Sequence, residues 1–161
     1  PKDIKILEVE EVDLEFHSRF SAKTRAYKFI LTPNRSVFET RYITEIKDEI
    51  NVEKLYEIMK DFIGVHNFDS FRMTDCGGKN PVREILEIKC SQIKDEKIEI
   101  YIKGNAFLKT QIRIMVGSSL AVYFGEKDKN YIKQKLKEPD SKGEKIIIEG
   151  SGLYLAEIDY E

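Results

Sequence analysis

The pattern of apolar and polar positions predicts several strands. Period-two alternation places Tyr27, Phe29 and Leu31 on one face of a strand, and the same alternation recurs on both sides of residues 94–96. A three-residue connection is short enough for an antiparallel hairpin. The segment 3–12 has β-prone residues without helical spacing, and the chain ends in extended segments. The predicted strands and extended segments are 3–12, 26–31, 82–93, 97–103, 146–148 and 153–160.

Helical spacing predicts three helices. Asn51 is a suitable N-cap for the first, which carries an apolar side and ends at Gly64. The third is a lysine-rich segment, 129–138, that Pro139 stops. The second lies between two glycines and begins at about Phe107. Its apolar residues are Leu108, Ile112, Met115, Val116, Leu120, Tyr123 and Phe124.

Together these elements predict one α+β domain over residues 1–161. Strands, helix, hairpin, helix and strand follow one another with no linker-like stretch, and 41% of the residues are hydrophobic. We expect a largely antiparallel sheet with two main helices packed on one face. The other face is then open to a ligand, and Tyr27 and Tyr101 are candidates for base stacking, although a buried tyrosine is the commoner explanation.

Charge and cysteine content limit the class of protein. Lys and Arg number 27 against 29 Asp and Glu, so a net charge of -2 argues against a strong non-specific binder of polyanions. Cys76 and Cys90 lack redox-motif spacing, which predicts reduced thiols in a cytoplasmic protein. No segment is long and apolar enough to span a membrane, so we expect no membrane partner.

Metal and phosphate-loop chemistry find little support in the sequence. His17, His66 and the two cysteines are not at ligand spacing, so we expect no metal site. The Gly77-Gly78-Lys79 run lacks the phosphate-loop spacing and is interpreted as a turn. A Gly-x-Ser-x-Gly elbow is absent as well.

Arg113 stands out because it interrupts the apolar central helix. A guanidinium carries a permanent charge and five donors, so burying it beside Ile112 and Ile114 without a partner is costly. One interpretation is a carboxylate or phosphate partner in a site. The other is a residue at the edge of the buried stripe, with its head in water and a surface ion pair.

A dense cluster of basic and aromatic residues lies just before the predicted strand 26–31 and extends into it. A solvated, charge-protected strand edge and a nucleic-acid contact explain this composition about equally well. The cluster comprises His17, Arg19, Phe20, Lys23, Arg25, Tyr27 and Lys28.

Three stretches taken together resemble the C-terminal part of the tRNA pseudouridine synthase A family. They are residues 16–29 (FHSRFSAKTRAYKF), 104–117 (GNAFLKTQIRIMVG) and 152–155 (GLYL). The segments 67–71 and 83–85 match the intervening motifs of the family. The resemblance covers essentially the whole chain and implies half of a pseudouridine synthase fold.

The resemblance implies an activity, a partner and a site. Members isomerise uridine to pseudouridine in the anticodon stem-loop of tRNA, without a cofactor, as cytoplasmic homodimers that depend on a catalytic aspartate. Tyr27 resembles the tyrosine that packs on the target base, Arg113 the arginine that pairs with the aspartate, and Leu153 the apolar residue that closes the pocket. The RNA-binding candidates are His17, Arg19, Lys23 and Arg25.

Two departures from the family pattern affect the expected activity. The aspartate of the family lies in a Gly-Arg-Thr-Asp motif upstream of all these segments, so we expect the N-terminal half to be absent and this chain alone to be inactive. Asp75 stands in the wrong place in the order to replace it. Residues 109–114 lack the histidine pair of the family, which affects the tRNA contacts expected there. The alternatives are a stand-alone α+β RNA-binding module without catalysis and a structural or dimerisation domain.

Overall fold

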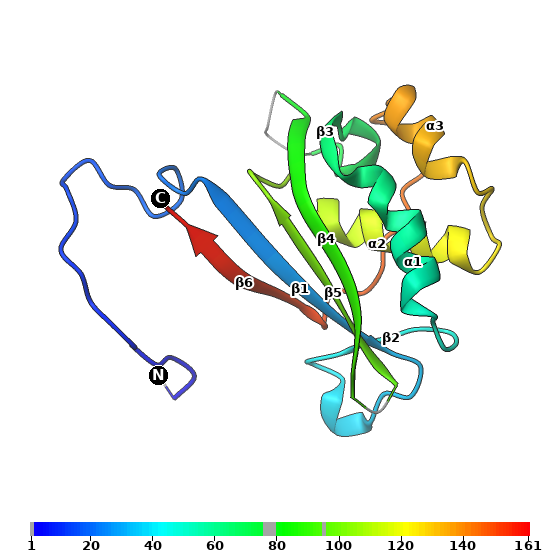
Figure 1. Ribbon diagram of the computed structural model, residues 1–161, viewed down its shortest axis with the longest axis horizontal. Coiled ribbons are helices and arrows are strands. Elements are labelled where there is room, and N and C mark those ends of the chain that lie inside the picture. The colour runs from blue at the N-terminus through cyan, green and yellow to red at the C-terminus, as the bar shows by residue number, and fades with distance from the viewer. Residues whose placement is uncertain (1, 76–79, 95) are drawn as a thin grey trace.

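The computed structural model describes residues 2–75, 80–94 and 96–161. The described residues form a six-stranded sheet and three α-helices (Figure 1). The strands are β1 (Thr24–Thr32), β2 (Thr44–Glu45), β3 (Gly64–Asn67), β4 (Val82–Lys94), β5 (Lys97–Gly104) and β6 (Leu153–Asp159), and the helices are α1 (Val52–Met59), α2 (Gln111–Tyr123) and α3 (Tyr131–Lys137). Single turns of 3-10 helix are η1 (Val37–Glu39), η2 (Lys60–Phe62) and η3 (Asp69–Phe71).

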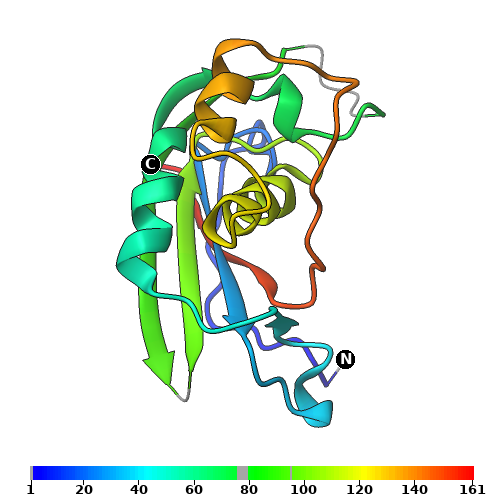
Figure 2. The ribbon, with the colours of Figure 1, turned by 90° about the vertical axis from the view of Figure 1, so that its right-hand side faces the viewer.

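The sheet has the order β2-β1-β5-β4-β3, and β6 pairs with β1. Every pairing is antiparallel except that of β1 with β2. The helices lie together at one side of Figure 1, and Figure 2 shows α2 nearly along its axis beside the strands. Residues of α1, α2 and the sheet belong to one buried apolar cluster. The predicted α+β architecture is therefore confirmed.

The central strands explain why one face of the sheet is covered. Ile98, Ile100 and Ile102 of β5 are at most 2% exposed, and the last two stand opposite Phe29 and Tyr27 of β1. Side chains alternate across a strand, so this single set of positions builds the apolar face. The predicted hairpin is confirmed as β4 and β5.

The period-two alternation predicted for residues 82–93 fails within β4. Alternation would place Leu86 on one face with Ile88 and Cys90, but a register shift between Ile85 and Glu87 changes the direction of the side chains at that point. Ile85 and Ile88 are buried, whereas Leu86 is 44% exposed. A bulge adds one residue to one strand, and nothing in the apolar pattern marks it.

The predicted first and third helices are present but shorter than expected. The Asn51 side chain accepts a hydrogen bond from Lys54 N at 2.9 Å, which caps α1 as predicted. The α-helix ends at Met59 and continues as η2, and Gly64 already belongs to β3. The lysine-rich segment forms α3.

The central helix begins at Gln111, later than predicted. Gln111 Oε1 accepts from Leu108 N at 2.8 Å, and Thr110 adopts a left-handed φ of 65°. These contacts hold residues 105–110 in a loop ahead of the helix. Gly117 allows close approach of the chain, since a Cβ there would lie 2.4 Å from the Ile146 carbonyl oxygen.

The predicted strand over residues 3–12 is wrong. This N-terminal segment is irregular and extends away from the sheet in Figure 1, with Ile6 75% and Leu7 83% exposed. β-prone residues form a strand only where a neighbour supplies hydrogen bonds, and no described segment pairs with these residues. The turn predicted at 77–79 and the state of Cys76 lie outside the described residues.

The C-terminal extended segments are organised around β6. Strand β6 pairs with β1 on one side, and among the described residues no strand covers its other side. Leu155 is 52% and Ile158 42% exposed along this edge. Residues 146–148 are extended without forming a strand, and Ile148 N donates to the Arg113 carbonyl at 3.4 Å.

Candidate functional site

The fold brings Tyr27, Arg113 and Leu153 to one small cavity of about 100 Å³. Tyr27 lies on β1, Arg113 in the first turn of α2 and Leu153 at the start of β6. These residues are far apart in the sequence and meet because β6 pairs with β1 beside the N-terminal end of α2. The other lining residues are Phe107, Leu108, Thr110, Gln111 and Ile112.

Arg113 is held by the main chain and by no acidic side chain of the described residues. Its Nε donates to the Ile148 carbonyl at 2.8 Å, and the side chain is half-buried. A Cβ at Gly150 would lie 3.2 Å from Arg113 Cδ, so this segment fits closely against the guanidinium. Because a half-buried cation favours an anionic partner, the two terminal nitrogens can receive a carboxylate.

Tyr27 supplies an aromatic wall. Its ring meets Phe107 edge-on, with centroids 5.2 Å apart and an interplanar angle of 84°. It stands opposite Ile102 on β5 and Leu155 on β6. These neighbours fix the ring, so a flat base entering the cavity meets a rigid surface.

A larger cavity of about 630 Å³ adjoins the first and shares Tyr27 and Phe107 with it. Its described lining residues include three arginines, Arg19, Arg25 and Arg83, and no Asp or Glu. Aromatic and aliphatic side chains of the loop before β1 and of β6 complete the lining of this cavity. The pair of cavities combines positive charge with flat apolar walls.

Arg25 is committed to main-chain carbonyls. Its Nη1 donates to Ala22 O at 3.0 Å and to Asn105 O at 2.8 Å, and its Nη2 donates to Arg19 O. Arg25 therefore ties the loop before β1 to the loop after β5. Its charge still faces the larger cavity.

The other predicted RNA contacts lie in the same region. His17 Nδ1 accepts from Arg19 N at 3.1 Å and from Phe20 N at 3.4 Å, so the imidazole organises its own loop. The side chains of Arg19 and Lys23 are exposed. Lys23 is anchored through its backbone, since its N–H donates to Asp159 O at 2.8 Å.

Phe107 and Arg83 were not among the sequence-derived site residues. The sequence pattern places Phe107 at the start of a helix. Only its contact with Tyr27 on β1 shows that it forms a wall of the cavities. Arg83 was noted in the 83–85 motif. The pairing of Ile85 with Gly104 places the start of β4 beside the loop after β5, and Arg83 lines the larger cavity together with Phe107 of that loop. The sequence signal for Arg83 was that a basic residue lies inside a motif that matches the family.

Two other candidates lie outside both cavities. Tyr101 donates to Glu157 Oε2 at 3.0 Å on the face of the sheet away from the helices, and partial burial together with this carboxylate raises its pKa to about 12. Asp75 pairs with Lys109, and this hydrogen bond holds the pKa of the Asp75 carboxyl below its ordinary value. Neither residue lines a cavity with Tyr27.

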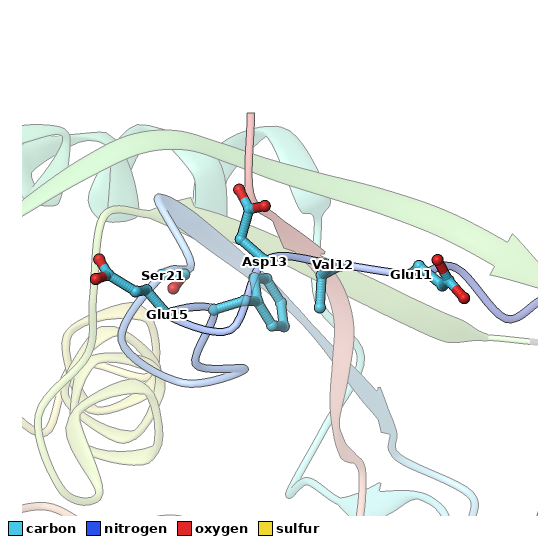
Figure 3. A pocket seen from close by; sticks show the side chains of 6 residues that line it. Glu11, Val12, Asp13, Glu15 and Ser21 are labelled. Carbon is cyan, nitrogen blue, oxygen red and sulfur yellow. The ribbon is translucent and has the colours of Figure 1, made fainter.

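An acidic hollow lies in the N-terminal segment. It is lined by Glu11, Asp13 and Glu15 among others, and Figure 3 shows these three carboxylates pointing in different directions. Over residues 2–75, 80–94 and 96–161, no group of His, Cys, Asp or Glu side chains could hold a metal ion. Helices long and apolar enough to cross a membrane are likewise absent from the described chain.

Comparisons with known proteins point in one direction. The family model described as tRNA pseudouridine synthase matches residues 58–161. The tRNA pseudouridine synthase A of Finegoldia magna is 39% identical over 98% of this chain, and tRNA pseudouridine synthase A 2 of Clostridium tetani is 35% identical over 99%. In both cases the chain spans 65% of the length of the relative. A chain of the "Crystal Structure of a Cbf5-Nop10-Gar1 Complex" aligns with 62% of this chain, and this chain covers 26% of it, at a TM-score of 0.39 and 13% identity.

Proposed function

The chain belongs to the tRNA pseudouridine synthase A family, and from this premise we propose that it is the C-terminal portion of an enzyme that converts uridine to pseudouridine in the anticodon stem-loop of tRNA. The single observation that carries the proposal is the half-buried Arg113. It lies beside Tyr27 and has no carboxylate partner among the described residues.

Arg113 favours an anionic partner, and the described residues do not supply one. We propose that an aspartate from the portion of the protein upstream of residue 1 enters the smaller cavity and pairs with the terminal nitrogens of Arg113. An adjacent guanidinium favours the ionised form of a carboxylate in a water-poor site. The ionised aspartate is then available as a nucleophile toward the ribose or the base of the target uridine, and it leaves again when the product forms. Overall the N1–C1′ bond breaks, the C5–C1′ bond forms, and the base loses the proton on C5 and gains one on N1.

The remaining walls would hold the uracil ring. Tyr27 would pack on the base, and its edge-on contact with Phe107 prevents the ring from turning aside. Leu153 would close the cavity from β6 and exclude water. No cofactor is required in this scheme.

The test compares two proteins on an unmodified tRNA transcript. One is this chain alone, and the other is the same chain extended upstream to its natural start. Pseudouridine formed only by the extended protein is the expected result, since the aspartate lies outside these residues. Turnover by the short chain would refute the division of the site, and tRNA binding without turnover by both would favour an RNA-binding module.

Oligomeric state and cellular location are also part of the proposal. We propose that the complete protein acts as a cytoplasmic homodimer, as the family resemblance implies. Sedimentation of the extended protein at several concentrations would test the dimer directly. A single monomeric species throughout that range would contradict it.

A further inference from the structure

Phe20 projects from the loop before β1 at the rim of the larger cavity. It is 75% exposed and has two contact partners in its own loop. The His17 ring lies 4.4 Å away between centroids, and the Arg19 guanidinium carbon stands 5.5 Å from the centre of the Phe20 ring. The mostly exposed ring thus contacts an imidazole and a cation of its own loop.

The loop that carries Phe20 is fixed at several points. Ser21 Oγ accepts from His17 N at 3.0 Å, and Ser21 N donates to His17 O at 2.8 Å. Tyr160 Oη donates to Ser18 O at 2.8 Å, which joins the loop to the chain after β6. Arg25 adds its bonds to Arg19 O and Ala22 O. Phe20 therefore extends from a pre-organised loop, and little ordering entropy remains to be lost on binding.

The cavity beside Phe20 is suited to a nucleotide. Its volume of about 630 Å³ lies within the range of small-molecule sites, and its described lining includes the arginines Arg19, Arg25 and Arg83. Carbonyl bonds hold Arg25 without cancelling its charge. Exposed aromatic rings beside arginines are the combination that binds single-stranded nucleic acid, with stacking for the base and ion pairing for the phosphate.

We propose that Phe20 is a stacking platform for one nucleobase that flanks the target uridine, and that Arg19 pairs with a phosphate of the same strand. The flanking position follows from the walls that the two cavities share, Tyr27 and Phe107. The inference rests on the proposed function, because it names a second RNA contact of the same site.

The experiment measures the Kd of an unmodified tRNA transcript for the upstream-extended protein and its variants. Phe20→Ala is expected to weaken binding by about 5-fold to 150-fold, the loss typical of one stacked base. Phe20→Trp keeps a flat ring and is expected to bind within about twofold of the parent. Phe38→Ala is the matched control, since Phe38 is 89% exposed on η1 and lines neither cavity, and it should not change the Kd.

Arg19→Ala tests the phosphate contact through salt. The slope of log Kd against log salt concentration should fall by about 0.7 to 0.9, the value for one neutralised phosphate. Parent-like binding by Phe20→Ala, or an unchanged slope for Arg19→Ala, would overturn the inference. So would equal losses in Phe20→Ala and Phe20→Trp with a lowered Tm, because Phe20 would then pack against protein. A parent protein that binds tRNA without modifying it would refute the proposed function alone, and the Phe20 comparison would still stand.

Discussion

Arg113 Nε donates to the Ile148 carbonyl at 2.8 Å, and this bond determines which nitrogens of the guanidinium remain for a ligand. Residue 148 lies in the extended segment before β6, so the chain that leads to Leu153 also orients the arginine. One stretch of backbone, residues 148–153, therefore helps to position both Arg113 and Leu153 at the smaller cavity.

Arg113→Lys in the upstream-extended protein should lower turnover by about 100-fold to 1,000-fold, the cost of losing a positioned charged donor. A lysine cannot donate to Ile148 and to a carboxylate in the same planar geometry. The measurement is the single-turnover rate of pseudouridine formation, with exposed Arg41→Lys as the control. A rate within threefold of the parent would contradict the role assigned to Arg113.

Arg25→Met should loosen the loop before β1 without abolishing the fold. The substitution keeps an apolar stem but removes the donors to Ala22, Arg19 and Asn105. Amide hydrogen exchange in residues 17–22 should accelerate by at least tenfold, while β5 keeps its protection. If the loop amides exchange at the parent rate, Arg25 is not the tie that the structure indicates.

Gly152→Ala should lower the free energy of unfolding by about 1–3 kcal/mol, as overpacking of a closed site does. A Cβ at residue 152 would lie 2.1 Å from the Ile30 carbonyl oxygen, and backbone must shift to admit it. Gly125→Ala is the contrasting variant, because that site is open and only its φ of 75° opposes a side chain. Urea unfolding should rank Gly152→Ala as the less stable protein, and the reverse order would contradict the packing argument.

Cys90 should be a slow nucleophile. Burial raises the pKa of its thiol from 9.0 to about 12, so almost no thiolate forms at pH 8. Alkylation by iodoacetamide in a Cys76→Ser background should be much slower than for the urea-unfolded chain. The folded state holds the thiol proton of Cys90 more tightly than the unfolded state does. The contribution of Cys90 to the free energy of unfolding therefore falls as the pH rises from about 9 towards 12. Equal alkylation rates in the folded and unfolded chains would refute the assignment.

The sequence predicted most of the regular structure because single-strand and single-helix patterns encode it. The alternation of Ile98, Ile100 and Ile102 and the cap at Asn51 both depend on neighbours a few residues away. The register shift beside Leu86 depends on strand pairing, which no local pattern records. The late start of α2 accompanies a local bond from Leu108 N to Gln111 Oε1, which the apolar pattern does not mark. The β-prone residues 3–12 show the same limit, because a strand needs a partner as well as a propensity.

The candidate site was predictable in part. The family resemblance pointed to Tyr27, Arg113 and Leu153, and the fold places them around one cavity. The resemblance could not show that Arg25 is bound to three carbonyls or that Phe107 faces Tyr27. Those relations arise from the pairing of β1 with β5 and β6, which brings the adjoining loops together.

The uncovered edge of β6 has a practical consequence for work with this chain. Among the described residues, β6 pairs with a strand on one side only, and Leu155 and Ile158 are exposed on it, so it is a template for pairing with another copy. The apparent molar mass of the isolated chain from light scattering should therefore rise with protein concentration, and a constant monomer mass would contradict this expectation. Storage of dilute samples, or fusion to a highly charged carrier, would slow this association between copies.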